Sequence, residues 1–388
     1  MSLAATLTVV FCAPVAGLAV DRFGVRFPAA FSLAALALGF LGLASMTGSI
    51  AQYTVIQVAL FAFAIASTPI SFTRAVNERF VAARGLALGL TLAGTGITAA
   101  IAPLAVAAII ADQGWRTAYI RLAMVVALSI PAVLLLLRPK RHSTKPILIV
   151  ALPVAASTGS LSTLRLQLND RRFVRLYAAF FFLALGVSGF VLHLVPMLND
   201  AGMTLVEVAA IQARLGLAVI AGRLVIGVAV DHFFAPRVAA LSLCATIGGM
   251  VALAVFGTPA APWSAFAIGF ALGAEVDLIG YLTVRYFGLA AYGRLYGLLY
   301  GSFLLGTGLS PLVIATIAAG SGGYSSALWV CATFVGITVA LLATAPRFPA
   351  ADEYFERRTS ADERAAPSDH GSQSDPAWPL RLAGAINH

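Results

Sequence analysis

Eleven long apolar runs constrain the fold of this 388-residue chain more than any other feature. A helix needs about 20 apolar residues to cross the hydrocarbon core of a bilayer. Backbone groups in lipid must be hydrogen-bonded within the protein, so only helices and closed barrels can span it. Barrel strands would alternate in polarity over about ten residues, which these runs do not. We therefore predict an all-α membrane bundle with spans at 1–20, 27–46, 51–72, 86–110, 117–137, 173–197, 204–229, 236–256, 262–284, 295–318 and 324–345.

The composition excludes most other classes of protein. With 60% hydrophobic and 11% charged residues and a mean hydropathy of +0.93, the chain has too little polar surface for a soluble domain. The net charge of +9 fits basic residues gathered on the cytoplasmic side of a membrane better than nucleic-acid binding. The three cysteines lie far apart in apolar runs and predict neither a metal site nor a disulfide framework. No phosphate-binding loop or catalytic cluster is present, so we expect neither an enzyme nor a cofactor.

The charges of the loops predict the domain organisation and the orientation. Residues 1–137 form an N-terminal half with five spans and residues 173–345 a C-terminal half with six, joined by the basic linker 138–172. The polar tail 346–388 is expected to be disordered. Alternate loops carry most of the arginines, and the positive-inside rule places these loops, the linker and the C-terminus in the cytoplasm. We expect a multi-pass protein of the inner membrane, acting as a monomer.

An internal repeat relates the two halves. Gly17 and Asp21 recur 210 residues later as Gly227 and Asp231, and Thr73 recurs as Thr283. Such repeats are common among secondary transporters. The same offset places the partner of span 173–197 before Met1, so we expect a twelve-helix fold of which this chain, N-terminally truncated or mis-started, lacks the first helix. A signal peptide is a poor alternative, because no basic segment precedes the first apolar run.

Several motifs resemble the major facilitator superfamily. The loop Gly17-Leu18-Ala19-Val20-Asp21-Arg22-Phe23-Gly24-Val25-Arg26 resembles the loop between helices two and three of that family. Other segments resemble its monocarboxylate and oxalate/formate branch: Arg84-Gly85-Leu86-Ala87-Leu88-Gly89, Gly114-Trp115-Arg116, Gly222-Arg223-Leu224, Arg285-Tyr286-Phe287-Gly288 and Tyr292-Gly293-Arg294. The resemblance covers essentially residues 1–345 and implies a secondary transporter, by symport or antiport. Span 51–72 lacks the arginine found in many sugar and drug transporters of the superfamily, which argues against those branches.

Ionisable groups inside the bilayer are costly and are therefore functional candidates. Arg223 lies eight residues before Asp231, roughly 12 Å into the membrane, and could bind a carboxylate through two parallel hydrogen bonds. The branch resemblance also implies a substrate-binding arginine at this position, and the alternative is a structural ion pair. Further candidates are Arg214 and His193 for the substrate, and Glu275 and Asp277 for proton coupling or an ion pair with an arginine. Arg214 is nine residues from Arg223 and should face the opposite way.

A second set of residues is too close to the cytoplasmic loops to touch a substrate at the midplane. We expect a charge latch that closes the inner side, or alternatively solvated topogenic loops, for Asp21, Arg22, Arg26, Asp231 and Arg237. Close helix approach and local bending are predicted at six repeated small or proline residues: Gly94, Gly96, Pro103, Gly306, Gly308 and Pro311.

The leading functional hypothesis is transport of a small organic anion, a monocarboxylate or dicarboxylate, by alternating access, with protons as a candidate coupling ion. An efflux carrier for hydrophobic compounds is the second. A third is a scaffold, a sensor or an inactive protein, because of the missing helix.

Overall fold

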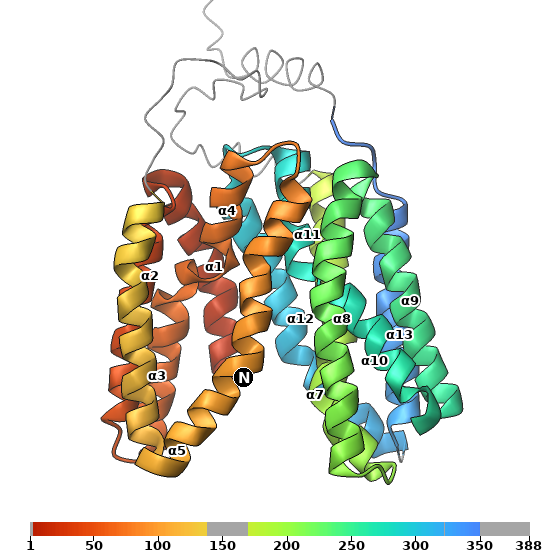
Figure 1. Ribbon diagram of the computed structural model, residues 1–388. Coiled ribbons are helices and arrows are strands. Elements are labelled where there is room, and N and C mark those ends of the chain that lie inside the picture. Colours follow the sequence, from red (N-terminus) through yellow and green to blue (C-terminus); the bar gives the residue numbers. More distant parts are fainter. Residues whose placement is uncertain (1–2, 138–169, 322, 350–388) are drawn as a thin grey trace, which may run out of the picture. The chain divides into compact units, whose positions relative to one another are not determined.

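The computed structural model describes residues 3–137, 170–321 and 323–349, and every regular element in these ranges is helical (Figure 1). The tail 350–388 and most of the linker, 138–169, lie outside the described residues. The helices belong to one unit, Met1–Arg347. Their bounds are α1 Leu3–Phe23, α2 Arg26–Ala44, α3 Ile50–Phe63, η1 Ile65–Ser67, α4 Pro69–Arg79, α5 Arg84–Leu136, α7 Arg171–Asp200, α8 Leu205–His232, α9 Ala235–Phe256, η2 Thr258–Ala260, α10 Ala261–Leu272, α11 Glu275–Phe287, α12 Tyr292–Ser321 and α13 Tyr324–Ala343.

The helices confirm the predicted membrane bundle. Within the described ranges, nine helical stretches are long and apolar enough to cross a bilayer, and α3 is a shorter apolar helix. The predicted spans 86–110 and 117–137 both lie in α5, which is interrupted at Gly114. Gly114 has a φ of 81°, a conformation that suits glycine because it has no Cβ. The predicted separation of these two spans is therefore present as a turn inside α5.

Two of the predicted spans are broken helices. The span 51–72 consists of α3, η1 and the start of α4, and the span 262–284 consists of α10 and α11. The interruptions occur at Ala64 and Ala274, which are separated by the same 210 residues as the other repeated positions. Pro69 begins α4, where its missing N–H costs no helical hydrogen bond. The internal repeat therefore extends to the places where helices break, which in transporters mark binding regions.

The bundle has two ends with different charge. The arginine-bearing turns are those that follow α1, α4, α8 and α11, and all lie at one end, which we call the basic end: Arg22, Arg26, Arg79, Arg84, Arg237, Arg285 and Arg294. It is uppermost in Figure 1. The opposite end holds the turns before α3, α8 and α10. Placement of the basic end in the cytoplasm is a prediction from the sequence.

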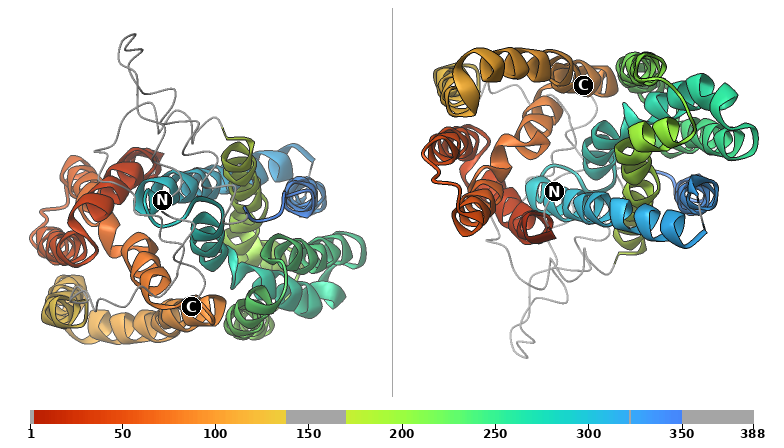
Figure 2. Two further views of the ribbon diagram at one scale, coloured as in Figure 1. Left: turned by 90° about the horizontal axis from the view of Figure 1, so that it is seen from above. Right: turned by 90° about the horizontal axis from the view of Figure 1, so that it is seen from below.

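The N-half (α1–α5) and the C-half (α7–α13) meet along two long helix pairs, α1 with α12 and α5 with α8 (Figure 2). Glycines on one face of α12 allow the first pair to approach closely. A Cβ on Gly297 would lie 2.4 Å from the carbonyl oxygen of Ala13, and one on Gly301 would lie 3.4 Å from that of Val10. Contact at this distance is possible only where side chains are absent or small.

The repeated glycines differ between the halves. A Cβ on Gly306 would lie 2.5 Å from the Phe181 carbonyl oxygen, and one on Gly308 would lie 2.4 Å from the Thr6 side chain, so both permit close packing. Among the described residues nothing lies within 4 Å of a Cβ on Gly94, and a Cβ on Gly96 would have only an ordinary contact with Ile220, so close helix approach at these two glycines stays a prediction. Gly306 faces α7 and Gly308 faces α1, whereas the position of Gly94 on α5 has no described neighbour.

Burial shows the same difference between the halves. Only 6% of the most apolar segment in Ala105–Leu136 is buried, against 56% in Arg171–Asp200.

Of the two repeated prolines, Pro311 lies inside α12, and the side chain of Pro103 is outside the described part. The additional first helix of the expected twelve-helix fold stays a prediction.

Candidate functional site

Asp21 joins the two halves at the basic end. Its carboxylate, near the end of α1, accepts hydrogen bonds from the backbone N–H groups of Gly293 (2.8 Å) and Arg294 (2.9 Å) at the start of α12. The same carboxylate forms an ion pair with Arg74 of α4, and both side chains are largely buried. The first N–H groups of a helix have no partner inside the helix and carry partial positive charge. A carboxylate from the other half satisfies them here.

Asp231 repeats this arrangement in the second helix pair. Near the end of α8, it accepts hydrogen bonds from the backbone N–H groups of Gly85 (2.7 Å) and Leu86 (3.0 Å) at the start of α5. Each half thus provides one aspartate and one helix N-terminus. We call these two contacts the paired aspartate caps.

Glycine contacts accompany both caps. Beside Asp21, a Cβ on Gly17 would lie 1.9 Å from the carbonyl oxygen of Gly293. Beside Asp231, a Cβ on Gly85 would lie 2.2 Å from the carbonyl oxygen of Gly227. The backbones touch at these points, and this close approach brings each carboxylate within hydrogen-bonding distance of the N–H groups.

The other residues of the predicted latch lie elsewhere. Arg22, Arg26 and Arg237 place their guanidinium groups over neighbouring phenylalanine rings, at 5.5, 5.5 and 5.8 Å from the ring centroids. In the described part of the chain these three arginines form no ion pair with Asp21 or Asp231. Of the five charges predicted for a latch, the structure brings Asp21 and Asp231 into contact with helix N-termini of the other half, and Asp21 also pairs with Arg74.

A polar network between the halves was not predicted from the sequence. The hydroxyl group of Tyr292 donates to the Thr73 hydroxyl (2.9 Å) and accepts from the Asn77 amide (3.1 Å). The same amide lies 3.3 Å from the carbonyl oxygen of Gly280. Tyr292 and Thr73 are fully buried. The one sequence signal near this network is the repeat of Thr73 as Thr283. The identity of a tyrosine or an asparagine does not indicate which residue it bonds to.

We expect Tyr292→Phe to destabilise the protein by about 2 kcal/mol, because it removes two buried hydrogen bonds, one with Thr73 and one with Asn77. Thermal unfolding of the purified protein measures the effect. Tyr53→Phe is the matched control, since the Tyr53 hydroxyl accepts a hydrogen bond from Gln57 in an exposed position. Equal unfolding temperatures for the two variants would contradict the importance of the network.

A buried charged group lies deeper in the bundle. Arg223 of α8 approaches Asp277 of α11, with 3.5 Å between Nη1 and Oδ1, and their side chains are 11% and 8% exposed. Glu275, at the first position of α11, is 1% exposed. The break before α11 thus places two acids near an arginine of a neighbouring helix.

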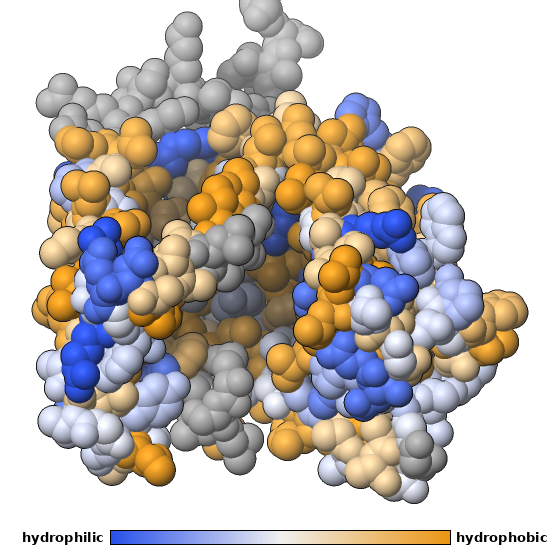
Figure 3. Space-filling model, turned by 60° about the horizontal axis from the view of Figure 1, so that its bottom comes forward, coloured by the Kyte–Doolittle hydropathy of each residue, from blue (hydrophilic) through white to orange (hydrophobic). Residues whose placement is uncertain are grey.

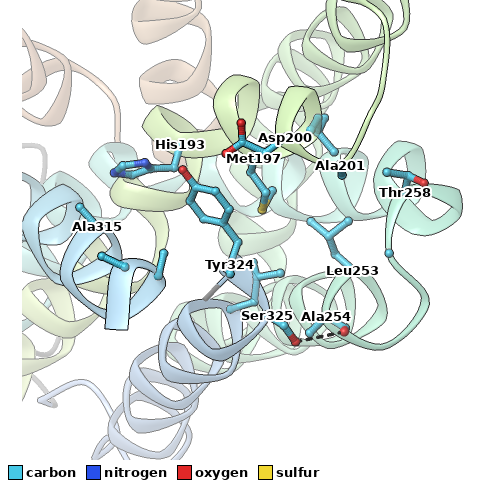
Figure 4. Close-up of a pocket in the computed structure, with 16 residues that line it drawn as sticks. His193, Met197, Asp200, Ala201, Leu253, Ala254, Thr258, Ala315, Tyr324 and Ser325 are labelled. Carbon is cyan, nitrogen blue, oxygen red and sulfur yellow. Dashed lines mark hydrogen bonds between the residues drawn. The ribbon is translucent and has the colours of Figure 1, made fainter. Parts of the chain in front are cut away.

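The other predicted substrate residues lie apart from this group. Arg214 is exposed, as its opposite position on α8 predicts. His193 lies in a pocket of about 670 Å³ within the C-half, at the end opposite to the basic end (Figure 4). Its Nε2 is 3.2 Å from the Pro311 carbonyl oxygen, and its ring packs on Tyr324. The lining of this pocket is mostly apolar and includes no arginine or lysine among the described residues. The structure therefore separates His193 from Arg223.

The two ends of the bundle differ in closure. At the basic end the aspartate caps and glycine contacts hold the halves together. Seen from the opposite end, the surface is hollowed between the halves (Figure 3). The described halves are thus in contact at the basic end and separated at the opposite end.

Known proteins support the same class. A sequence search of curated proteins gave no match. The fold is similar to the fucose:proton symporter FucP of E. coli, with a TM-score of 0.70 and 15% identity over 89% of this chain and 90% of that one. It is similar to the human organic anion transporter TETRAN (TM-score 0.69, 16% identity, 87% and 82% covered). It is also similar to the proton:xylose symporter XylE (TM-score 0.66, 11% identity, 88% and 85% covered). The family profile named Major Facilitator Superfamily matches residues 1–284. With that match over most of its length, the chain belongs to the major facilitator superfamily.

Proposed function

We propose that the protein is a secondary active transporter of a small organic anion, a mono- or dicarboxylate, and that it works by alternating access. The observation that carries the proposal is Arg223, a largely buried guanidinium deep in a membrane helix. Membership of the superfamily supports secondary transport. The choice of an anion rests on the chemistry of the arginine and on the resemblance to the monocarboxylate branch.

The environment of Arg223 is suited to exchange of partners. Its contact with Asp277 is long, at 3.5 Å, and its Nε has no hydrogen-bond partner among the described residues. A planar guanidinium can bind a carboxylate through two parallel N–H···O bonds, which a single long contact does not use. A substrate carboxylate can therefore offer Arg223 a better geometry than Asp277 does.

Release of the substrate requires the other end to open. In the proposed cycle the anion enters from the hollowed end, and the paired aspartate caps then separate to open the basic end. The basic end would face the cytoplasm, as the positive-inside rule predicts, and the protein would reside in the inner membrane. Opening breaks the hydrogen bonds of the caps, so the free energy of these bonds sets the population of the state that is open at the basic end.

The experiment compares Arg223→Ala with Arg214→Ala, two arginines of the same helix in different surroundings. Both variants are reconstituted in liposomes, and uptake of radiolabelled acetate, L-lactate, oxalate and succinate is measured with and without a pH gradient. We expect Arg223→Ala to weaken apparent affinity at least 30-fold, because losing one partner of a buried charge pair costs about 2 kcal/mol or more. Arg214→Ala should change it less than threefold.

Two further variants separate binding from folding. Arg223→Lys keeps the charge but loses the fork geometry, so it should retain an intermediate affinity. Arg223→Ala with Asp277→Asn removes both charges and avoids an unpaired acid. Saturable anion uptake that survives in Arg223→Ala would remove the assigned role. Uptake of none of the four anions, together with export of a hydrophobic dye, would favour the efflux alternative.

A further inference from the structure

We propose that Glu275, together with Asp277 and Arg223, forms a site for a single proton, and that this proton is the coupling ion of the transporter. The inference rests on the proposed function, because coupling has meaning only if the chain transports a substrate. It assigns to Glu275 a task separate from substrate binding, which remains with Arg223.

Glu275 is the most deeply buried acid in the described part of the chain. Its side chain is 1% exposed, and neither carboxylate oxygen has a hydrogen-bond partner there. Asp277 has one oxygen near Arg223 and one without a partner. An ionised carboxylate without partners is very costly inside a protein, and a proton removes that cost.

Counting charges gives the number of protons. Arg223 lies close enough to both Glu275 and Asp277 to act on them electrostatically. Two carboxylates and one guanidinium leave one negative charge in excess. One bound proton makes the group neutral, and Glu275 is the place for it because Asp277 already holds the contact with Arg223.

No other charge nearby can replace this proton among the residues that the structure describes. From α12, Tyr296 interacts with Asp277. The helix α5 presents Gly89 close to Asp277, and α10 contains no ionisable residue. From α9 the ionisable groups are Arg237, at its start, and the exposed Cys244. From α4, Thr73 and Asn77 bond to Tyr292.

The remaining charges lie at the basic end. Within the described residues of the helices around α11 they are Arg74, Glu78, Arg79, Arg84, Asp231, Arg285 and Arg294. The other charges of α5 and α8 are exposed and lie toward the opposite end: Asp112, Arg116, Arg121, Glu207 and Arg214.

The void beside Asp277 admits at most about one water molecule. The void that borders Asp277 measures about 10 Å³, close to the smallest volume that holds one water. An organic anion or a hydrated metal ion does not fit there. This void is therefore too small for the substrate, whereas a proton on the buried carboxyl group of Glu275 needs no additional space.

The position of the void connects the proton to the conformational change. It lies between α5 and α8 and is lined by Gly85, Gly227 and Tyr281, next to the cap made by Asp231. A Cβ on Gly89 of α5 would lie 3.8 Å from Oδ2 of Asp277. When α5 and α8 separate, Asp277 gains a path to the basic end, and Glu275 is connected to this path through the group that it forms with Asp277 and Arg223. Glu275 then loses its proton to water, and its carboxylate must be protonated again before the caps can close.

The first test detects the proton itself, without any substrate. Infrared spectroscopy of the reconstituted protein at neutral pH should show the carbonyl band of a protonated carboxyl group in a site shielded from solvent. We expect Glu275→Gln to lack this band. Glu207→Gln is the matched control and should keep it, because Glu207 is an exposed acid that caps the start of α8 and glutamine can cap in the same way. A spectrum of Glu275→Gln identical to that of the unmodified protein overturns the proton site.

The second test measures coupling with L-lactate as the probe and a pH dye inside the vesicles. In the unmodified protein and in Glu207→Gln, lactate uptake should change the pH of the lumen, with a fixed number of protons moved per lactate. Proton symport acidifies the lumen, and proton antiport makes it more alkaline. In Glu275→Gln, uptake driven by a pH gradient should fall at least tenfold relative to lactate–lactate exchange. An unaltered ratio of driven uptake to exchange contradicts the coupling role. An infrared band without transport of any tested anion would instead contradict the proposed function and leave the proton site standing.

Discussion

Asp21→Ala is expected to shift the protein toward a state that is open at the basic end by about 100-fold. The variant removes two charge-assisted hydrogen bonds to the N-terminus of α12 and the ion pair with Arg74. Hydrogen bonds to charged groups each contribute about 1.5–3 kcal/mol, so a net loss of about 3 kcal/mol is reasonable after water replaces some of them. Asp231→Ala should have a similar effect on the α5–α8 pair, and the double variant a larger one.

Distances between spin labels measure this shift. Labels at positions 80 and 233, which carry exposed phenylalanines after α4 and α8, report the separation of the halves at the basic end. The three native cysteines are first replaced by serine. Asp112→Ala is the control, since Asp112 is an exposed aspartate of α5 near Gly114. Label distances in Asp21→Ala that match those in Asp112→Ala would show that the caps do not hold this end closed.

Gly293→Ala is expected to prevent closure of the basic end by steric exclusion rather than by loss of attraction. The added methyl group would lie 2.3 Å from the carbonyl oxygen of Gly17, a backbone atom that cannot rotate away. Overpacking of this kind costs about 1–3 kcal/mol, and the double variant with Gly17→Ala should cost more. We expect transport to fall at least tenfold and the label distances to increase, although Asp21 is intact.

Gly248→Ala tests whether the effect is specific to the interface. Gly248 lies inside α9, where a Cβ added to this residue would have no described atom within 4 Å, and alanine is a better helix former than glycine. This control should transport normally and unfold at the same or a higher temperature. Normal transport by Gly293→Ala would show that α1 and α12 do not need backbone contact to close the basic end.

The sequence was informative where a physical signal is local. Apolar runs predicted the helices because length and polarity alone decide whether a helix suits a bilayer. Arg223 and Glu275 stood out because ionisable groups are rare in such runs. The repeat identified Asp21 and Asp231 together, and the structure places both between the halves.

The partners of those residues could not be predicted. Gly293 and Gly85 donate through their backbones, and every residue except proline has that donor. The pairing of Arg223 with Asp277 rather than Glu275 depends on a few ångströms of helix position, which periodicity does not fix. His193 was predicted to bind the substrate because it is a polar residue in an apolar span. The structure places it in a separate pocket, away from Arg223, which its polarity alone could not indicate.

Backbone recognition in the paired aspartate caps has a consequence for the study of related sequences. Asp21 contacts the backbone N–H groups of residues 293 and 294, and the N–H group of residue 294 is present whatever side chain that residue carries, proline excepted. A substitution at 294 therefore needs no compensating change at 21, and the two positions should not covary. Contact prediction from correlated mutations would miss the caps, while the steric demand at Gly17 and Gly293 should appear as a plain restriction to glycine.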